Sequence, residues 1–538
     1  MDVSSRRTFL AQAAAGAALA ARPAMAAEGH PAADAELFCA PLIPFRTSLS
    51  VMPSSEEVLA SCALTDGVYT ARTVAELQKL YMRHGATEVY QRIATLRGGP
   101  KPPLKDLGWS HGLERARLAR DLGLPFNPEL MVSAIYGDGA TYQIPPDFRD
   151  YPDIQLPGPW LSLTLEQMLP PLRQYGAEVA QQILATGVRV NVWDIGNEVE
   201  SGVAGVALRT RPPNGGKPPG TPRSLDAVLP PTPDYQPPDR VDPAIGEMSI
   251  MQLVMLPEAE RIAWCRAHLW PHVGRILAAL AEGIHSVVPG AKVSTHISPL
   301  GQKTPAVHLA FWQAVKEAGF TPHQFGFSYY PSGNHGDGPP DSLQWFKDTT
   351  TALKHRFGLP TFIAEGGYAS GPMPPPYLFD NQVETYPISP AGQYAFNRDL
   401  IAWGVRSGVL AGYRPWDPDF CNAPIWASMA WFQQQGKVAR ARPVLDAFEA
   451  VLPSIYLTVG RRRGDELPIS ARVSQGALAG AMIELTDAGR VIARQPLPAL
   501  SRVWTQVNLS AERVRGGGTY AIAARRGGRT LMERRIEL

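Results

Sequence analysis

Short apolar runs that stop abruptly at polar or charged side chains recur along the chain. Residues 190–195 form one such run, and Asn197 and Glu198 follow it after a glycine. Residues 359–364 form a second run, which ends at Glu365 before two glycines. Runs of this length without a helical period are typical of strands buried on both faces, as in a parallel sheet. Both glutamates are therefore predicted to lie at the ends of buried strands.

Strand-like and helical patterns alternate along most of the chain. Thr73 and Glu76 have the spacing of a capping box, which predicts a helix beginning there. Residues 164–186 have a helical pattern, in which Pro170 and Pro171 predict a break or a kink. Strands are expected near residues 37–52, 87–96, 129–136, 190–198, 292–298, 324–330, 360–365 and 409–415. About eight strand-helix units predict an α/β fold, a (β/α)8 TIM barrel.

The chain is expected to divide into a large and a small domain. The barrel is predicted over residues 37–454, with its last helix near 439–452. Short β-like runs over residues 455–538 predict a small all-β, sandwich-like C-terminal domain. Residues 201–245 are rich in Pro and Gly and leave directly from the strand end at Glu198. Because loops of this length are uncommon unless functional or disordered, we expect a lid or cleft wall rather than an unstructured insertion.

The first 26 residues have the order of a signal peptide. Arg6 and Arg7 precede an Ala-rich apolar stretch, and residues 24–26 supply the small side chains of a cleavage site. The arginine pair resembles a twin-arginine signal, which implies export by the twin-arginine (Tat) machinery to the periplasm or the extracellular space. The apolar stretch is too short and too weakly hydrophobic for a stable membrane span.

Composition narrows the class of partner. The chain has 538 residues, of which 45% are hydrophobic, so it can bury a large core. A formal net charge of +2 without a basic, aromatic-rich stripe argues against nucleic acid. Cys39 and Cys62 are candidates for a disulfide, and buried free thiols are the alternative. No His, Cys or Asp cluster has convincing metal-ligand spacing, so no cofactor or metal is expected, although a calcium ion in the loops is left open.

The two strand-end glutamates suggest a glycosidase. Cleavage of an acetal needs one carboxylic acid and one carboxylate across the bond, and catalytic groups of a (β/α)8 barrel project from the carboxyl ends of its strands. Glu200 is a competing carboxyl group, because an extended backbone after Glu198 would place it on the same side. Other polar or aromatic residues expected at strand ends are Asn197, His296, Tyr329, Tyr330 and Trp416.

Three strand-end segments, residues 193–198, 326–331 and 363–368, resemble a known group of enzymes. They are similar to the retaining (β/α)8-barrel glycoside hydrolases of clan A, and most similar to glycoside hydrolase family 53, the arabinogalactan endo-β-1,4-galactanases. The resemblance implies a double-displacement mechanism that needs no cofactor. It makes Glu198 the general acid/base and Glu365 the nucleophile.

The resemblance also implies roles for residues that bind the substrate or support the nucleophile. Asn197 is expected to hydrogen-bond the sugar 2-hydroxyl, a contact that strengthens in the transition state. Arg92, from the second predicted strand, is expected to pair with the nucleophile, and an ordinary surface or interface salt bridge is its alternative. Either Tyr329 or Tyr330 is expected to donate a hydrogen bond to Glu365.

Two further candidates and two departures from family 53 bear on the substrate. His296 is a candidate sugar contact or a structural residue, and Trp416 a stacking platform or part of the core. Residues 134–138 lack the family's His and Trp pattern, and residues 330–333 lack its following aromatics. The expectation is therefore a secreted enzyme on a β-linked polysaccharide or oligosaccharide, most like β-1,4-galactan. A gluco-, manno- or xylo-configured glycan, or a non-catalytic carbohydrate-binding role, is the alternative.

Overall fold

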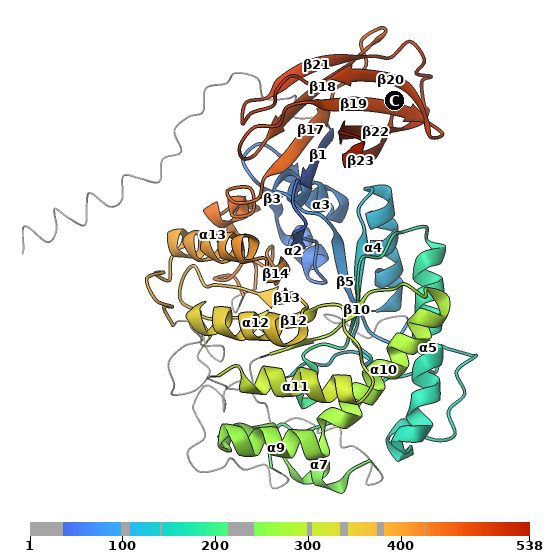
Figure 1. The fold of residues 1–538 in the computed structure, drawn as a ribbon, viewed down its shortest axis with the longest axis vertical. Helices are drawn as coiled ribbons and strands as arrows, with labels where there is room; N and C mark the ends of the chain where they lie inside the picture. The colour runs from blue at the N-terminus through green and yellow to red at the C-terminus, as the bar shows by residue number, and fades with distance from the viewer. Residues whose placement is uncertain are drawn as a thin grey trace, which may run out of the picture.

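The computed structural model describes eight stretches of the chain, residues 36–97, 108–139, 143–212, 241–298, 304–333, 343–373, 381–423 and 426–538. The predicted signal peptide lies outside the described residues, as do residues 213–240, most of the segment predicted to be a lid. Figure 1 shows an α/β body with the C-terminal antiparallel strands gathered at one end.

The body is built on two parallel sheets. Their strands are β2 (Arg46–Thr47), β5 (Val89–Ile93), β6 (Phe126–Leu130), β7 (Trp193–Ile195), β10 (Val293–Ser294), β11 (His296–Ile297), β12 (Phe325–Tyr329), β13 (Thr361–Gly366) and β14 (Leu410–Pro415). One sheet has the order β10-β7-β6-β5 and the other β11-β12-β13-β14-β2. Only Thr295 separates β10 from β11, and the N–H of Thr87, just before β5, donates to the Thr47 carbonyl of β2 at 2.9 Å. The two sheets therefore adjoin at both edges.

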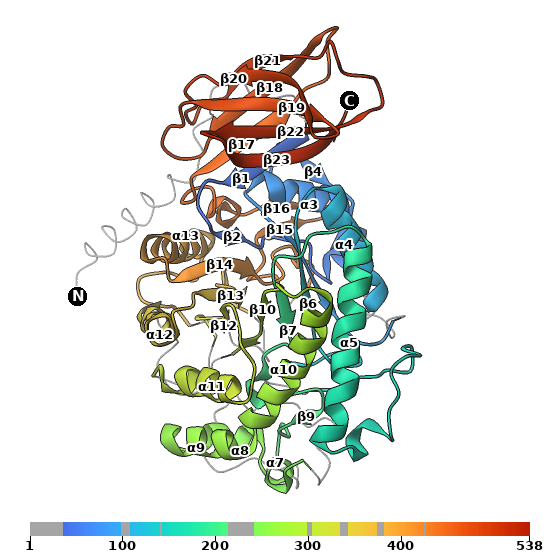
Figure 2. The same cartoon turned by 45° about the vertical axis from the view of Figure 1, so that its right-hand side comes forward.

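Helices pack outside these sheets, as Figures 1 and 2 show. The longer ones are α3 (Val74–Arg83), α4 (Trp109–Asp121), α5 (Leu165–Ala185), α9 (Glu258–His268), α10 (Trp270–Val287), α11 (Ala306–Glu317), α12 (Leu343–Phe357) and α13 (Pro390–Ser407). The shorter ones are α2 (Ser55–Ser61), α7 (Pro243–Glu247) and α8 (Ile250–Met255). The alternation of strands and helices agrees with the predicted α/β fold.

Two helix predictions have different outcomes. The capping box is confirmed, because Thr73 Oγ1 accepts from the Glu76 N–H at 3.2 Å and Glu76 Oε2 accepts from the Thr73 N–H at 3.0 Å. The break expected at Pro170 and Pro171 is wrong, because α5 runs through both prolines, whereas the kink, the other expectation, stays a prediction. Since α5 packs along α10, tertiary packing compensates for the backbone hydrogen bonds that the prolines cannot donate.

Strand bounds differ from the prediction in two places that matter. The strand expected near residues 129–136 begins earlier, at Phe126, so Glu129 lies inside it. The stretch 37–52 holds two strands, of which only β2 joins the parallel sheets. The other, β1 (Glu36–Pro41), pairs antiparallel with β17 (Ser454–Val459), so the C-terminal domain takes one strand from the start of the described chain.

The last helix predicted, near residues 439–452, is wrong. Its first part belongs to a hairpin of β15 (Phe432–Gln435) and β16 (Val438–Ala441), whose turn holds Gly436 at φ +65°. β16 continues the pairing onto β3 (Ala63–Thr65), which pairs in turn with β4 (Thr70–Ala71), and a 3-10 turn over Pro443–Asp446 follows. The glycine turn and the sheet pairing prevail over the helical pattern.

The C-terminal domain consists of two four-stranded antiparallel sheets, β1-β17-β18-β21 and β20-β19-β22-β23. Its remaining strands are β18 (Glu466–Val473), β19 (Ala481–Asp487), β20 (Arg490–Pro496), β21 (Thr505–Ser510), β22 (Thr519–Arg526) and β23 (Arg529–Glu537). Buried residues alternate with more exposed ones along β18, as expected of a strand with one face on a core. The all-β composition agrees with the prediction.

The four cysteines are all buried free thiols, which was the alternative to a Cys39–Cys62 disulfide. Cys39 contacts Tyr456, and burial raises the pKa of its thiol to about 12. Cys62 lies instead beside Cys421. Among the described residues, no helix combines the length and the apolar character needed to cross a membrane.

Candidate active site

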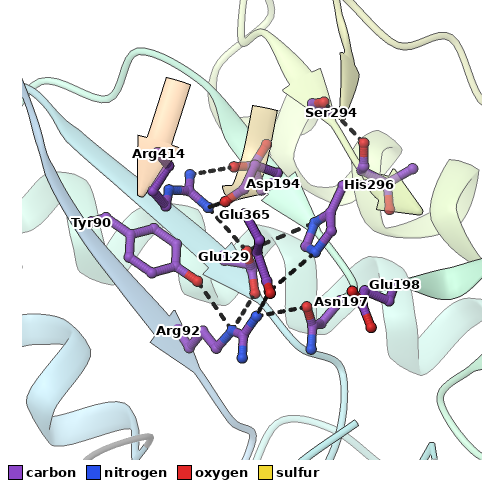
Figure 3. Close-up of polar contacts among 12 residues, drawn as sticks. Tyr90, Arg92, Glu129, Asp194, Asn197, Glu198, Ser294, His296, Glu365 and Arg414 are labelled. Carbon is purple, nitrogen blue, oxygen red and sulfur yellow. Dashed lines mark hydrogen bonds and ion pairs between the residues drawn. The ribbon is translucent and has the colours of Figure 1, made fainter. Parts of the chain in front are cut away.

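Side chains from several parallel strands meet at the carboxyl ends of those strands (Figure 3). Glu365 lies near the end of β13, Arg92 near the end of β5, and His296 at the start of β11. Asn197 and Glu198 follow β7 directly. Predicted site residues far apart in sequence are thus brought together.

Glu365 is surrounded by groups that favour a carboxylate. Its Oε1 forms an ion pair with Arg92 Nη2, and its Oε2 accepts a hydrogen bond from the Tyr330 hydroxyl at 2.8 Å. His296 Nε2 lies 3.5 Å from Oε1. Each oxygen of the Glu365 carboxyl group therefore has a partner that holds it in position.

Arg92 is a buried cation with a partner for most of its donors. Its Nε donates to Glu129 Oε1 at 2.8 Å and to the Tyr90 hydroxyl at 3.1 Å, and Nη2 donates to Asn197 Oδ1 at 2.8 Å. The ring of Trp416 lies over the guanidinium, with its centroid 3.9 Å from Cζ. Because a buried charge is costly without partners, these contacts hold Arg92 against Glu365.

A second buried arginine, Arg414, contacts the same glutamate as the first. Arg414 Nη1 approaches Glu129 Oε2 at 3.3 Å, and Nη2 approaches Asp194 Oδ2 at 3.1 Å. Burial raises the pKa of Asp194. Glu129 and Arg414 were not among the predicted site residues, although a charged residue inside an otherwise apolar strand indicates a paired, buried charge.

His296 is fully buried beside these charges. Burial and the charge of Arg92 lower the pKa of its imidazole to about 3, so the ring is neutral at ordinary pH. Glu129, His296 and Glu365 have ligand atoms within 4.8 Å of one another, a spacing that a metal ion would accept. Arg92 and Arg414 already neutralise the two carboxylates, and their charges would repel a cation. This cluster does not fit a metal site.

Glu198 lies in quite different surroundings. Its backbone is left-handed, with φ 47°, after Gly196 at φ +78°, where a Cβ would lie 2.3 Å from a Val199 methyl. The turn directs the Glu198 carboxyl group to the Gly139 N–H, which donates to Oε2 at 3.2 Å. Burial and the neighbouring Asp138 carboxylate raise the pKa of Glu198, so the group tends to keep its proton.

An extended backbone after Glu198 was expected, with Glu200 on the same side. This expectation is wrong. Residues 199–201 form a 3-10 turn, and Glu200 is only 1% exposed. Its carboxyl group accepts hydrogen bonds from the N–H of Ser298, at 3.1 Å, and from the Ser298 hydroxyl. Burial and Glu198 raise its pKa.

The remaining candidates divide between the site and the core. Tyr330 contacts Glu365, whereas Tyr329 stacks on Phe346 at a centroid distance of 4.2 Å and lies in the core. Asn197 Nδ2 donates to the Gly137 carbonyl at 2.6 Å, and the amide faces Arg92 through its oxygen. Trp416, partly exposed, and His296 lie in the site. Of the two tyrosines, Tyr330 is therefore the one whose described hydrogen bond reaches Glu365.

Comparison with known proteins identifies the fold. No protein-family model and no curated protein sequence match the chain. The structure of a fungal β-1,4-galactanase superposes with a TM-score of 0.52 at 17% identity, over 76% of this chain and 99% of that one. An Ignisphaera aggregans GH53 catalytic domain gives a TM-score of 0.52 at 15% identity, over 76% and 96%. The chain therefore has the fold of these glycoside hydrolases.

Proposed function

We propose that the protein is a retaining glycoside hydrolase, with Glu365 as the nucleophile and Glu198 as the general acid/base. The observation that carries this proposal is the contrast between the two carboxyl groups at the strand ends. Glu365 contacts a cation and a hydroxyl donor, whereas Glu198 lies among other carboxyl groups. One carboxylate and one carboxylic acid are what double displacement requires.

We further infer that the two parallel sheets form one (β/α)8 barrel. Their adjoining edges, at Thr295 and at the Thr87–Thr47 hydrogen bond, support a closed ring of parallel strands. The likeness to galactanase structures supports the same interpretation. Both glutamates would then face the mouth of the barrel, where catalytic groups of this architecture lie.

The proposed reaction begins with proton transfer from Glu198 to the glycosidic oxygen while Glu365 attacks the anomeric carbon. The bond to the leaving sugar breaks, and a covalent glycosyl-enzyme forms. Water then attacks the anomeric carbon and gives its proton to Glu198, which releases Glu365. Two inversions leave the anomeric configuration unchanged. Asn197 is proposed to bind the sugar 2-hydroxyl through its amide, held in place by Arg92 and Gly137.

The proposed substrate is a β-linked polysaccharide, most like β-1,4-galactan. The sequence resemblance and the galactanase neighbours support this choice. The departures at residues 134–138 and 330–333 leave gluco-, manno- and xylo-configured glycans as alternatives. The arginine pair and Ala-rich stretch at the N-terminus support export by the twin-arginine route, so the polymer is proposed to be periplasmic or extracellular.

Reducing-end release from a panel of β-linked polysaccharides, including β-1,4-galactan, tests the function. We expect the purified protein to act on at least one polymer, and Glu198→Gln and Glu365→Gln each to lose at least about 10³-fold in kcat/KM. Glu282→Gln, an exposed glutamate of α10, is the matched control. Activity on another polymer alone would discard galactan and keep the chemistry. No activity of the folded protein on any polymer would favour a carbohydrate-binding role instead.

An aryl glycoside with a good leaving group separates the two roles. Such a leaving group needs no proton, so Glu198→Gln should still form the glycosyl-enzyme but hydrolyse it slowly. Added azide should then accelerate turnover and give a glycosyl azide of unchanged configuration. Glu365→Gln should remain inactive on the same substrate. If azide rescues Glu365→Gln rather than Glu198→Gln, the two roles are reversed.

A further inference from the structure

Glu200 is a buried carboxyl group next to the proposed acid/base, and the proposed mechanism does not use it. It is 1% exposed. In the part of the chain that the structure describes, no Lys or Arg forms an ion pair with it. A buried carboxyl group without a cation normally keeps its proton, yet Ser298 supplies two donors suited to a carboxylate. Its environment therefore calls for an explanation.

The two glutamates pack against one glycine. The Gly139 N–H donates to Glu198 Oε2 at 3.2 Å. A Cβ built on Gly139 would lie 2.2 Å from Glu200 Oε1 and 3.0 Å from the Glu198 Cβ, so both side chains use the space that the missing Cβ leaves. The Ser201 hydroxyl fixes this glycine by donating to its carbonyl at 2.8 Å. Glu198 and Glu200, the glutamate pair, are therefore held next to each other by their shared contact with Gly139.

Two carboxyl groups so close in a buried site cannot both ionise at little cost. The charged and titratable groups around them are Asp138, Arg92, Tyr136 and Tyr330 near Glu198, and Cys265 near Glu200. Asp138 adds further negative charge, and Arg92 is committed to Glu365 and Glu129. Near neutral pH the pair therefore shares a proton, and hydrogen bonding decides which partner carries the charge.

The donors are distributed unequally between the partners. Glu200 accepts from an N–H and a hydroxyl of Ser298, whereas Glu198 accepts from the Gly139 N–H and has the Ser328 hydroxyl beside it, which makes no hydrogen bond of ordinary distance and angle. We propose that Glu200 is a positioning residue: Ser298 holds the negative charge of the pair on Glu200, and that charge keeps the proton on Glu198. The inference rests on the proposed function, because the proton serves the leaving group. Glu198 transfers this proton to the leaving group and later takes one from the attacking water, so Glu200 gains and loses no proton.

Glu200→Gln tests the proposal through the pH dependence of kcat/KM on an unactivated substrate. Gln removes the neighbouring charge, so Glu198 should lose its proton more readily. We expect the alkaline limb of the profile to move to lower pH by about 1 unit. Glu200→Asp keeps the charge, so its alkaline limb should lie close to that of the unsubstituted protein. Lower activity at every pH with an unmoved limb would mean a structural role only, and would overturn the proposal.

Ser298→Ala is a second variant that removes one donor without altering either carboxyl group. The charge should then shift toward Glu198, so the alkaline limb should again move to lower pH. Melting temperatures of all variants monitor folding. An unmoved limb in folded Ser298→Ala would overturn the assignment of the charge to Glu200.

A measurement independent of turnover separates this inference from the proposed function. The Glu198 side-chain carboxyl carbon, labelled with ¹³C and assigned through Glu198→Gln, can be titrated by NMR. Its midpoint should fall in Glu200→Gln and not in Glu282→Gln. If no glycan is cleaved but the midpoint falls, the charge placement stands and the proposed function fails. An unchanged midpoint would reject the charge placement whatever the activity.

Discussion

Glu365 and Glu198 are the same residue type, and each lies at the end of a buried parallel strand or just after it, but their surroundings have opposite character. Around Glu365 are a buried arginine, a tyrosine hydroxyl and a neutral histidine. Around Glu198 are Asp138, Glu200, the Ser328 hydroxyl and one backbone N–H, that of Gly139. Figure 3 shows Arg92 and Glu198 on opposite sides of Asn197.

The difference shows that position at a strand end does not by itself assign a chemical role. The cation beside Glu365 comes from β5, a strand of the other parallel sheet, and is held by Glu129 of β6. The acidic surroundings of Glu198 come from the loop after β6 and from the turn that follows β7. Neighbours, rather than the residue itself, determine which carboxyl group carries a proton.

The largest effect is expected from Arg92→Met, which would remove the cation on the Glu365 side. Glu129 and Glu365 would be left as buried carboxylates that share no guanidinium. We expect a loss of about 3–5 kcal/mol in the free energy of unfolding, measured by urea denaturation. Arg398→Met, which removes an arginine that is 43% exposed, should cost less than about 1 kcal/mol. Equal losses in the two variants would contradict a stabilising role for the buried network.

The second-largest effect is expected in the pH dependence of activity, which follows the protonation of Glu198. The pKa of Glu198 lies above its usual value of 4.5, and the proposed acid must be protonated. Activity should therefore be present below the raised pKa and be lost as pH rises through it, with kcat/KM falling about tenfold per pH unit beyond. A profile on a natural glycan that stays flat from pH 6 to pH 9 would contradict this assignment.

Tyr330→Phe should have a smaller effect, confined to the Glu365 side. It removes the hydroxyl that donates to Oε2, so kcat/KM should fall about tenfold with a change of only about 1 kcal/mol in stability. Tyr329→Phe is the matched control, because its ring stacks in the core. If Tyr329→Phe loses as much activity as Tyr330→Phe, the assignment of the hydroxyl is wrong.

The smallest effect is expected on the shape of the pH profile in His296→Asn. The imidazole has a pKa of about 3 and is neutral throughout the working range. Its removal should lower activity without moving either limb of the kcat/KM profile. A limb near pH 6.5 that disappears in this variant would show that His296 titrates.

The sequence predicted features that depend on local pattern. Glu198 and Glu365 stood out because each ends an apolar run, and Thr73 because a capping box spans four residues. The choice between Tyr329 and Tyr330 depended on the pairing of β12 with β13, whose register shifts between Phe327 and Ser328. A one-residue shift exchanges the two faces of a strand, so only the folded sheet decides it.

Contacts between distant parts of the chain could not be predicted in the same way. Arg414 and Glu129 meet across 285 positions, and nothing in either local sequence names the partner. The strand at residues 438–441 was mistaken for part of a helix; one of its two pairing partners, β3, lies near the other end of the chain. Patterns within one segment determine how it is buried, whereas the partner depends on the whole fold.

The pairing of β1 with β17 has a consequence for the order of folding. Most of the described chain separates the two strands, so this contact is among those of highest sequence separation in the molecule. During synthesis β1 emerges early, and its edge has no partner until residues 454–459 have been made. A chain truncated before β17 leaves that edge exposed to pairing with other molecules, which makes aggregation the expected fate of C-terminal truncations.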